Sequence, residues 1–140
     1  MDIRIRAALW GAPLLIALAA CATAGAVPLG ESFSLAVGES ESIDGEDLIL
    51  TFDGVARDNR CPKGVQCIVA GAATVVLVAE IGGETRELTL DVPPGGSASE
   101  RLDGLEITVE RVDPGAVAGR RIEPEDYVVT VVVERTPPGS

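Results

Sequence analysis

The chain has 140 residues, no histidine and a formal net charge of −11 at pH 7. A chain of this length predicts one domain, and its acidic balance argues against nucleic acid as a partner, because like charges repel each other. The lack of histidine excludes Ser-His-Asp and Cys-His catalysis, and it also excludes metal sites built on imidazole.

Residues 1–20 have the features of an export signal. Arg4 and Arg6 form a positive n-region, and residues 7–20 form an apolar region that is interrupted by glycine and proline. This apolar region is shorter than the roughly 20 residues that a membrane-spanning helix needs. We therefore expect residues 1–20 to be a signal peptide rather than a transmembrane anchor.

The end of this signal, Leu18-Ala19-Ala20-Cys21, resembles the lipobox of bacterial lipoproteins. In that family the signal is cut before the cysteine, whose thiol carries a diacylglycerol, so the resemblance implies a lipid anchor at Cys21. Lipidation also accounts for the one cysteine of 3 that is left over when the other two pair. Ala22 in place of aspartate implies sorting to the outer membrane, with the domain facing the periplasm or the cell surface. Ordinary signal cleavage after Ala24 or Ala26 is the alternative.

Residues 21–31 are mostly small and predict a tether, and residues 32–136 predict a domain built from strands. Apolar and polar residues alternate in 33–37, 47–55, 84–92 and 105–112, with the period of two that is typical of half-buried strands. Residues 71–81 are nearly continuously apolar, which favours a central strand that is buried on both faces. Residues 127–135 predict the last strand, and residues 137–140 predict a disordered tail.

Turn signals separate these strands. Gly82-Gly83 predicts a two-residue hairpin, and residues 93–99, PPGGSAS, are not expected to continue a ladder because proline lacks the N–H donor. No stretch has helical periodicity with caps at both ends. Roughly six or seven short strands predict an all-β fold, namely an antiparallel β-sandwich of immunoglobulin-like size. A small closed barrel is the alternative.

Residues 122–129, IEPEDYVV, resemble the corner of fibronectin-type sandwich domains, in which a tyrosine follows a proline by a few residues. The resemblance implies that the hydroxyl of Tyr127 bonds to the backbone. An ordinary tyrosine at the edge of the core is the alternative.

Two cysteines, Cys61 and Cys67, lie in the stretch RDNRCPKGVQCIVAG at 57–71. Export would place them where disulfides persist, and Pro62 and Gly64 allow the chain to reverse direction between them. Their spacing differs from the Cys-x-x-Cys of redox enzymes, and a zinc site would need further ligands. We expect one disulfide that staples this loop.

The same stretch resembles the motif Asp-Ser-Arg-Cys-Pro…Val-x-Cys-x-Trp-Ala-Gly of small uncharacterised bacterial envelope proteins. Asn59 and Val69 stand where that motif has serine and tryptophan. The matching residues are Asp58, Arg60, Cys61, Pro62, Val65, Cys67, Ala70 and Gly71. The resemblance implies an envelope location and brings no settled activity.

Asp58 and Arg60 are two residues apart, so on an extended segment their side chains point the same way. We expect a charge pair that locks the loop. The alternative is that Arg60 and Lys63 present positive charge to an anionic partner. The candidate interaction loop consists of Asp58, Arg60, Lys63, Val65, Gln66 and Ile68.

Residues 38–48 gather five carboxylates, at Glu39, Glu41, Asp44, Glu46 and Asp47. Their spacing does not reproduce an EF-hand loop, so a solvated acidic turn is the main interpretation and Ca²⁺ binding is the alternative.

Together these features predict a lipid-anchored protein of the bacterial envelope that acts as a non-enzymatic binding or structural module. Its partners would be the membrane, through the anchor, and a candidate envelope protein; no cofactor, metal ligand or catalytic residue is expected. The alternative is a periplasmic protein that binds a small ligand or Ca²⁺ through the acidic turn. A third hypothesis is an inhibitor that presents the stapled loop to a protease.

Overall fold

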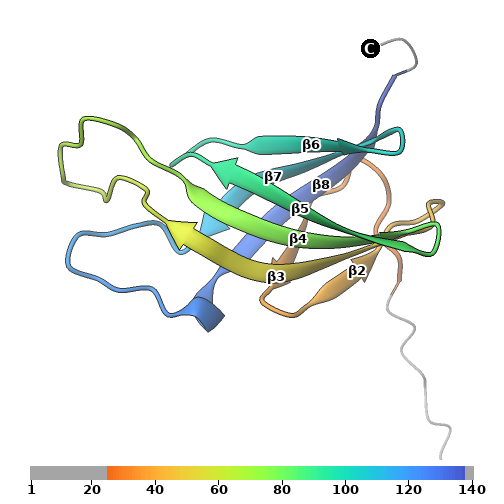
Figure 1. The fold of residues 1–140 in the computed structure, drawn as a ribbon, viewed down its shortest axis with the longest axis horizontal. Coiled ribbons are helices and arrows are strands. Elements are labelled where there is room, and N and C mark those ends of the chain that lie inside the picture. The colour runs from red at the N-terminus through yellow and green to blue at the C-terminus, as the bar shows by residue number, and fades with distance from the viewer. Residues whose placement is uncertain (1–24, 138–140) are drawn as a thin grey trace, which may run out of the picture.

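In residues 25–137, which the computed structural model describes, eight β-strands form two antiparallel sheets (Figure 1). The first sheet has the order β1 (Phe33–Ala36), β8 (Val128–Arg135), β7 (Leu105–Asp113), β6 (Ala98–Leu102). The second has the order β2 (Ser40–Ser42), β3 (Leu48–Asp58), β4 (Ala73–Ile81), β5 (Glu84–Val92). The predicted all-β sandwich is confirmed. The predicted signal peptide, Cys21 and residues 138–140 lie outside the described part.

The core between the sheets consists mainly of aliphatic side chains, because only 3% of the residues are aromatic. Phe52 is fully buried among valine, leucine and isoleucine residues from both sheets. In β4 every second residue from Ala73 to Ala79 is buried, whereas Val76 and Val78 are only half-buried. The expectation that this strand is buried on both faces is therefore wrong, because in the described part of the chain its outer face carries no further layer.

The predicted hairpin at Gly82-Gly83 is confirmed. Ile81 pairs with Glu84, and both glycines have positive φ, of 57° and 82°, as a two-residue turn of type I′ requires.

A second hairpin of the same kind was not predicted. Leu102 pairs with Leu105 across Asp103-Gly104, whose φ angles are 47° and 78°. The strand β6 that leads into this turn pairs with β7 from Ala98 onward. Residues 93–99 were expected to stay outside any ladder, and this is wrong for the last two of them, because the prolines and glycines end before Ala98.

Part of the predicted tether belongs to the sandwich. The backbone N–H of Val27 donates to Ser42 O at 2.8 Å, and Gly30 N–H donates to Val133 O at 2.9 Å. Val27 and Leu29 also pack against the core. The chain thus joins the domain at the end where β3 begins, which is opposite to the end where β3 runs into the cysteine loop (Figure 1).

No helix in residues 25–137 is long and apolar enough to cross a membrane. The single helical segment in this range is a 3₁₀ turn, η1 (Pro124–Asp126), which precedes β8.

Candidate binding site at the stapled loop

The stapled loop, residues 59–72, joins β3 to β4 and projects beyond the end of the sandwich (Figure 1). Cys61 and Cys67 form a disulfide with their Cα atoms 5.9 Å apart, so the predicted staple is confirmed. At the base of the loop, the N–H of Asn59 donates to Ala72 O at 3.0 Å, and the N–H of Cys61 donates to Ala70 O at 2.7 Å. The pairing of β3 with β4 therefore extends past the ends of both strands.

Gly71 allows the two arms of the loop to come close together. Its φ is +71°, and a Cβ placed there would lie 1.9 Å from the carbonyl oxygen of Asn59. Only glycine has both the conformational freedom and the absence of a side chain that this position requires.

Asp58 and Arg60 form the predicted charge pair at the base of the stapled loop. Arg60 Nε donates to Asp58 Oδ1 at 2.8 Å, and Nη2 donates to Oδ2 at 2.7 Å, which gives a bidentate pair. The two side chains are only 5% and 12% exposed. The alternative in which Arg60 presents its charge to a partner is therefore wrong for this residue, because its guanidinium is turned inward.

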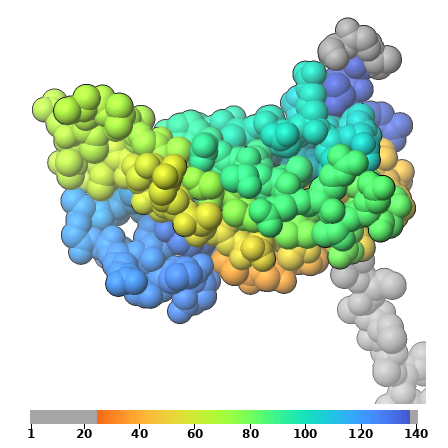
Figure 2. Space-filling view, viewed as in Figure 1, coloured from red at the N-terminus to blue at the C-terminus, as the bar shows by residue number. Residues whose placement is uncertain are grey.

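Arg60 also reaches a third segment of the chain. Its Nη1 donates to Val112 O at 3.0 Å, and its Nη2 donates to Pro114 O at 2.9 Å. The backbone N–H of Lys63 then donates to Ala116 O at 3.0 Å. These bonds tie the stapled loop to the loop of residues 114–123, which projects from the same end of the sandwich (Figure 2).

Tyr127 completes this network. Its hydroxyl donates to Asp58 Oδ2 at 2.9 Å, and the residue is 7% exposed. The expectation of a hydroxyl bonded to the backbone, taken from fibronectin-type domains, is wrong. The end of β3 places an ionised carboxylate within reach of the hydroxyl, and a carboxylate is a stronger acceptor than a carbonyl group.

The environment fixes the charge of each member of the network. Burial alone would raise the pKa of Asp58, but hydrogen bonds from Arg60 and Tyr127 outweigh it and lower that pKa below its usual value. The hydrogen bond to Asp58 raises the pKa of Arg60 further. Burial, together with the bond to Asp58, raises the pKa of Tyr127 to about 12. At neutral pH the network therefore consists of a carboxylate, a guanidinium and a neutral phenol.

This arrangement holds the stapled loop in place through the carboxylate of Asp58. Asp58 accepts hydrogen bonds from the backbone and side chain of Arg60 and from Tyr127. Its oxygen atoms are thus occupied by neighbouring groups. We interpret the three residues as a positioning network that holds the stapled loop on the sandwich.

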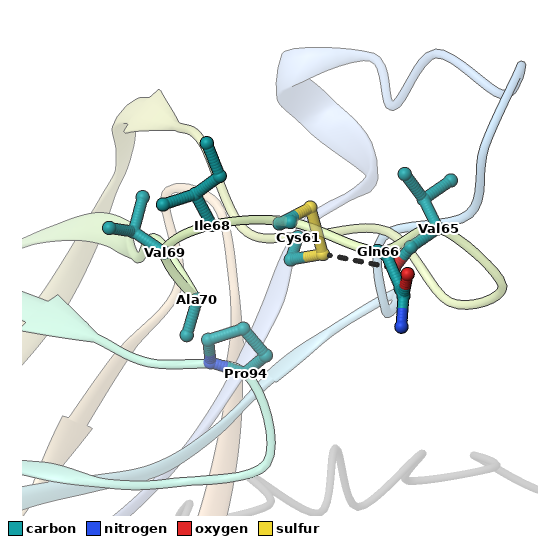
Figure 3. A pocket seen from close by; sticks show the side chains of 8 residues that line it. Cys61, Val65, Gln66, Ile68, Val69, Ala70 and Pro94 are labelled. Atoms are coloured by element: carbon teal, nitrogen blue, oxygen red, sulfur yellow. Dashed lines mark hydrogen bonds between the residues drawn. A yellow bond between two sulfur atoms is a disulfide. The ribbon is translucent and has the colours of Figure 1, made fainter.

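The tip of the loop is apolar and exposed. Ile68 is 105% exposed and Val69 is 74% exposed, and Val65 on the other side of the disulfide is 46% exposed (Figure 3). With Pro94 from the neighbouring loop, these side chains line a shallow depression around the disulfide. Lys63 and Gln66 are also exposed. Of the predicted interaction loop, four residues thus lie at the surface, whereas Asp58 and Arg60 form its support.

Some residues of this surface were not predicted. Val69 is the last residue of the loop, 58–69, on which the interaction surface was expected, but it was not among the named candidates. Its place next to Ile68 in a loop bounded by glycines was a usable signal. Pro94 and Arg120 reach the same end of the molecule from other loops, and Arg111 reaches it from the end of β7. No local pattern in the sequence indicates their proximity.

The acidic stretch of residues 38–48 is divided between a strand and two turns. Strand β2 occupies Ser40–Ser42 in its first half, Leu48 begins β3, and the carboxylate of Glu46 pairs with Arg135. Within residues 25–137, no group of three or more acidic or cysteine side chains lies close enough together to hold a metal ion. The Ca²⁺ alternative therefore has no gathered set of ligands in the described part of the chain.

Comparison of the chain with protein-family models, with curated proteins and with solved structures finds no significant match.

Proposed function

We propose that this chain is a lipid-anchored protein of the bacterial envelope whose sandwich binds a protein partner through the stapled loop, without catalysing a reaction. The observation that carries the proposal is the apolar tip of this loop. Ile68 and Val69 are exposed on a segment that a disulfide and a buried ion pair hold in one position.

The energetics favour a binding role for this tip. Burial of one such side chain stabilises a complex by about 1.5–3 kcal/mol, so the two residues offer several kcal/mol to a partner. A loop that is already held in its bound shape loses little conformational entropy on binding, and this preserves most of that gain. An apolar tip on a rigid support is therefore well suited to recognition.

Two arguments support the other parts of the proposal. The lipobox-like segment at Leu18–Cys21 and the odd number of cysteines support an anchored envelope location. The chain contains no histidine, and the polar atoms of Asp58, Arg60 and Tyr127 bond to one another or to backbone groups rather than facing a substrate. Both observations favour a binding module over an enzyme.

The test of the binding role uses the only lysine of the chain, Lys63, which lies in the stapled loop. Intact envelopes are treated with an amine-reactive cross-linker, and adducts of the full-length protein are identified by mass spectrometry. We expect a discrete adduct through Lys63 that is lost in Lys63→Arg. The adduct should weaken in Ile68→Ser and persist in Ile49→Ser, because Ile49 is an exposed isoleucine on the sheet. If Lys63 reacts with a monofunctional reagent but gives no adduct, the proposal is wrong.

The anchor is tested separately. Mass spectrometry of the N-terminal peptide should show a diacylglycerol on Cys21, and Cys21→Ser should release the protein from the membrane fraction. An unmodified chain that begins after Ala24 or Ala26 would contradict the lipid anchor and leave the binding test unaffected.

A further inference from the structure

We infer that the partner segment is acidic, and that its carboxylates enter a cationic cleft beside the apolar tip. This inference rests on the proposed function and specifies the chemistry of the partner. The cleft has a volume of about 500 Å³ and lies between the stapled loop, the loop after β5 and the loop after β7. Its charged lining comes from Lys63, Arg111 and Arg120, with Arg60 at its base and Asp113 as the one acidic residue.

The charge of this cleft is opposite to that of the molecule as a whole. Arg60 is neutralised by Asp58, and Arg111 Nε pairs with Asp113 at 2.7 Å. Lys63 and Arg120 make no ion pair with any carboxylate in the described residues. A chain with a net charge of −11 thus concentrates two uncompensated cations in one recess.

The cationic cleft and the apolar tip form one continuous surface. Cys61 and Pro94 line both the cleft and the depression around the disulfide, so the two recesses meet at these residues. Figure 2 shows the stapled loop and the loop of residues 114–123 side by side at the same end of the molecule, with a hollow between them. A ligand that fills this surface needs negative charge next to apolar groups. A peptide with aspartate or glutamate beside aliphatic side chains has this chemistry.

A protein segment fits these observations better than a membrane surface. Two cations in a recess match one or two carboxylates, whereas an anionic bilayer binds through a broad basic face. The negative charge of the whole chain would repel such a bilayer. The cleft also lies at the end of the sandwich opposite to Val27, where the described chain enters the fold. Strand β3 alone spans about 30 Å between these ends, several times the screening length of about 8 Å at physiological salt.

The experiment pans a random peptide library displayed on phage against the full-length protein in detergent. We expect the enriched peptides to contain aspartate or glutamate next to aliphatic residues. A synthetic peptide of the most enriched sequence should bind about tenfold more weakly to the double variant Lys63→Gln, Arg120→Gln. It should bind normally to Arg86→Gln, Arg101→Gln, which removes the same charge from exposed arginines elsewhere. Binding to the unaltered protein should also weaken as salt is raised.

Each other outcome overturns the inference. Enrichment of peptides without acidic residues would overturn the inference. If the binding of those peptides were lost in Ile68→Ser, the proposed function would still stand. Equal weakening by both double variants would show a general effect of charge rather than a cleft. Absence of any enrichment would also overturn it, and the Lys63 cross-link would still decide the proposed function. Binding to phosphatidylglycerol vesicles that is lost only in Lys63→Gln, Arg120→Gln would identify a lipid as the ligand.

Discussion

Replacement of Arg60 by methionine should destabilise the domain strongly, because the guanidinium of Arg60 connects three segments of the chain. The variant loses two bonds to Asp58 and two bonds to the carbonyl oxygens of Val112 and Pro114. It keeps an apolar chain of similar length, so most of the packing remains. Removal of one partner from a buried ion pair costs about 3–5 kcal/mol, because the other charge stays buried without its counter-ion. Asp58 would keep only the bonds from Tyr127 and from the backbone N–H of residue 60.

The matched control is Arg111→Met. Arg111 pairs with Asp113 at a similar distance of 2.7 Å, but the two side chains are 68% and 45% exposed. An exposed pair contributes at most about 1 kcal/mol. Urea unfolding of both variants, followed by circular dichroism, should therefore separate them by at least about 2 kcal/mol in the free energy of unfolding. Equal losses would refute the claim that the Arg60 network supports the fold.

The dependence on pH gives a second criterion. In the unaltered protein the pKa of Asp58 is lowered, so its contribution is present above its unfolded pKa and is lost as pH falls through the folded value. Without Arg60, burial acts against one remaining side-chain bond, and we expect the pKa of Asp58 to rise. The destabilisation by Arg60→Met should therefore be larger at pH 7, where Asp58 is ionised, than at about pH 3, where it becomes protonated in the variant. A loss that is the same at both pH values would contradict this account.

Three further predictions test other parts of the site. Ultraviolet titration of Tyr127, the chain's single tyrosine, should give a pKa of about 12. The stability linked to this shift should be lost as pH rises from the unfolded value of about 10 through the folded value. A pKa near the ordinary value of about 10 would show that the hydroxyl is not bonded to Asp58. Gly71→Ala should lower the free energy of unfolding, measured with heat or urea, by more than about 3 kcal/mol, because the new Cβ would clash with Asn59 O. The control is Gly64→Ala, which has a similar positive φ but open space around it, and it should lower this free energy by about 1 kcal/mol. Similar losses for the two alanines would argue against the close approach. Reduction of the disulfide should lower the free energy of unfolding by about 2 kcal/mol and leave the sandwich folded, since the loop that it closes is short; loss of strand signal in circular dichroism would contradict this.

The parts of the fold that the sequence predicts are those that depend on near neighbours. The alternation of apolar residues identifies β1, β3, β5 and β7, and apolar runs identify β4 and β8. Gly82-Gly83 identifies a turn that needs two positive φ angles. The pair of Asp58 and Arg60 follows from the geometry of an extended chain, in which residues two apart share a face. The strand β6 was missed because it is short and carries charged residues at an edge, although Asp103-Gly104 gave a turn signal.

The parts that could not be predicted depend on how the two sheets pack. Tyr127 is 69 residues from Asp58, and Val112 O is 52 residues from the guanidinium of Arg60. Nothing in the local sequence indicates which carbonyl groups will face a buried arginine, because carbonyl groups occur at every residue. The cleft between Lys63 and Arg120 likewise exists only after both loops are placed at the same end of the sandwich.

The network at Arg60 separates the residues that build the loops from those that face outward. Beyond Asp58, Arg60 bonds to main-chain carbonyls, of Val112 near the end of β7 and of Pro114 just after it, and the bond from Lys63 to Ala116 joins backbone to backbone. Side chains at the tip take no part in these bonds. They are therefore free to diverge in sequence while the loops keep their shape, much as variable loops do on a constant scaffold. Positions such as Ile68 should accept grafted recognition sequences, which makes the domain a candidate framework for engineered binders.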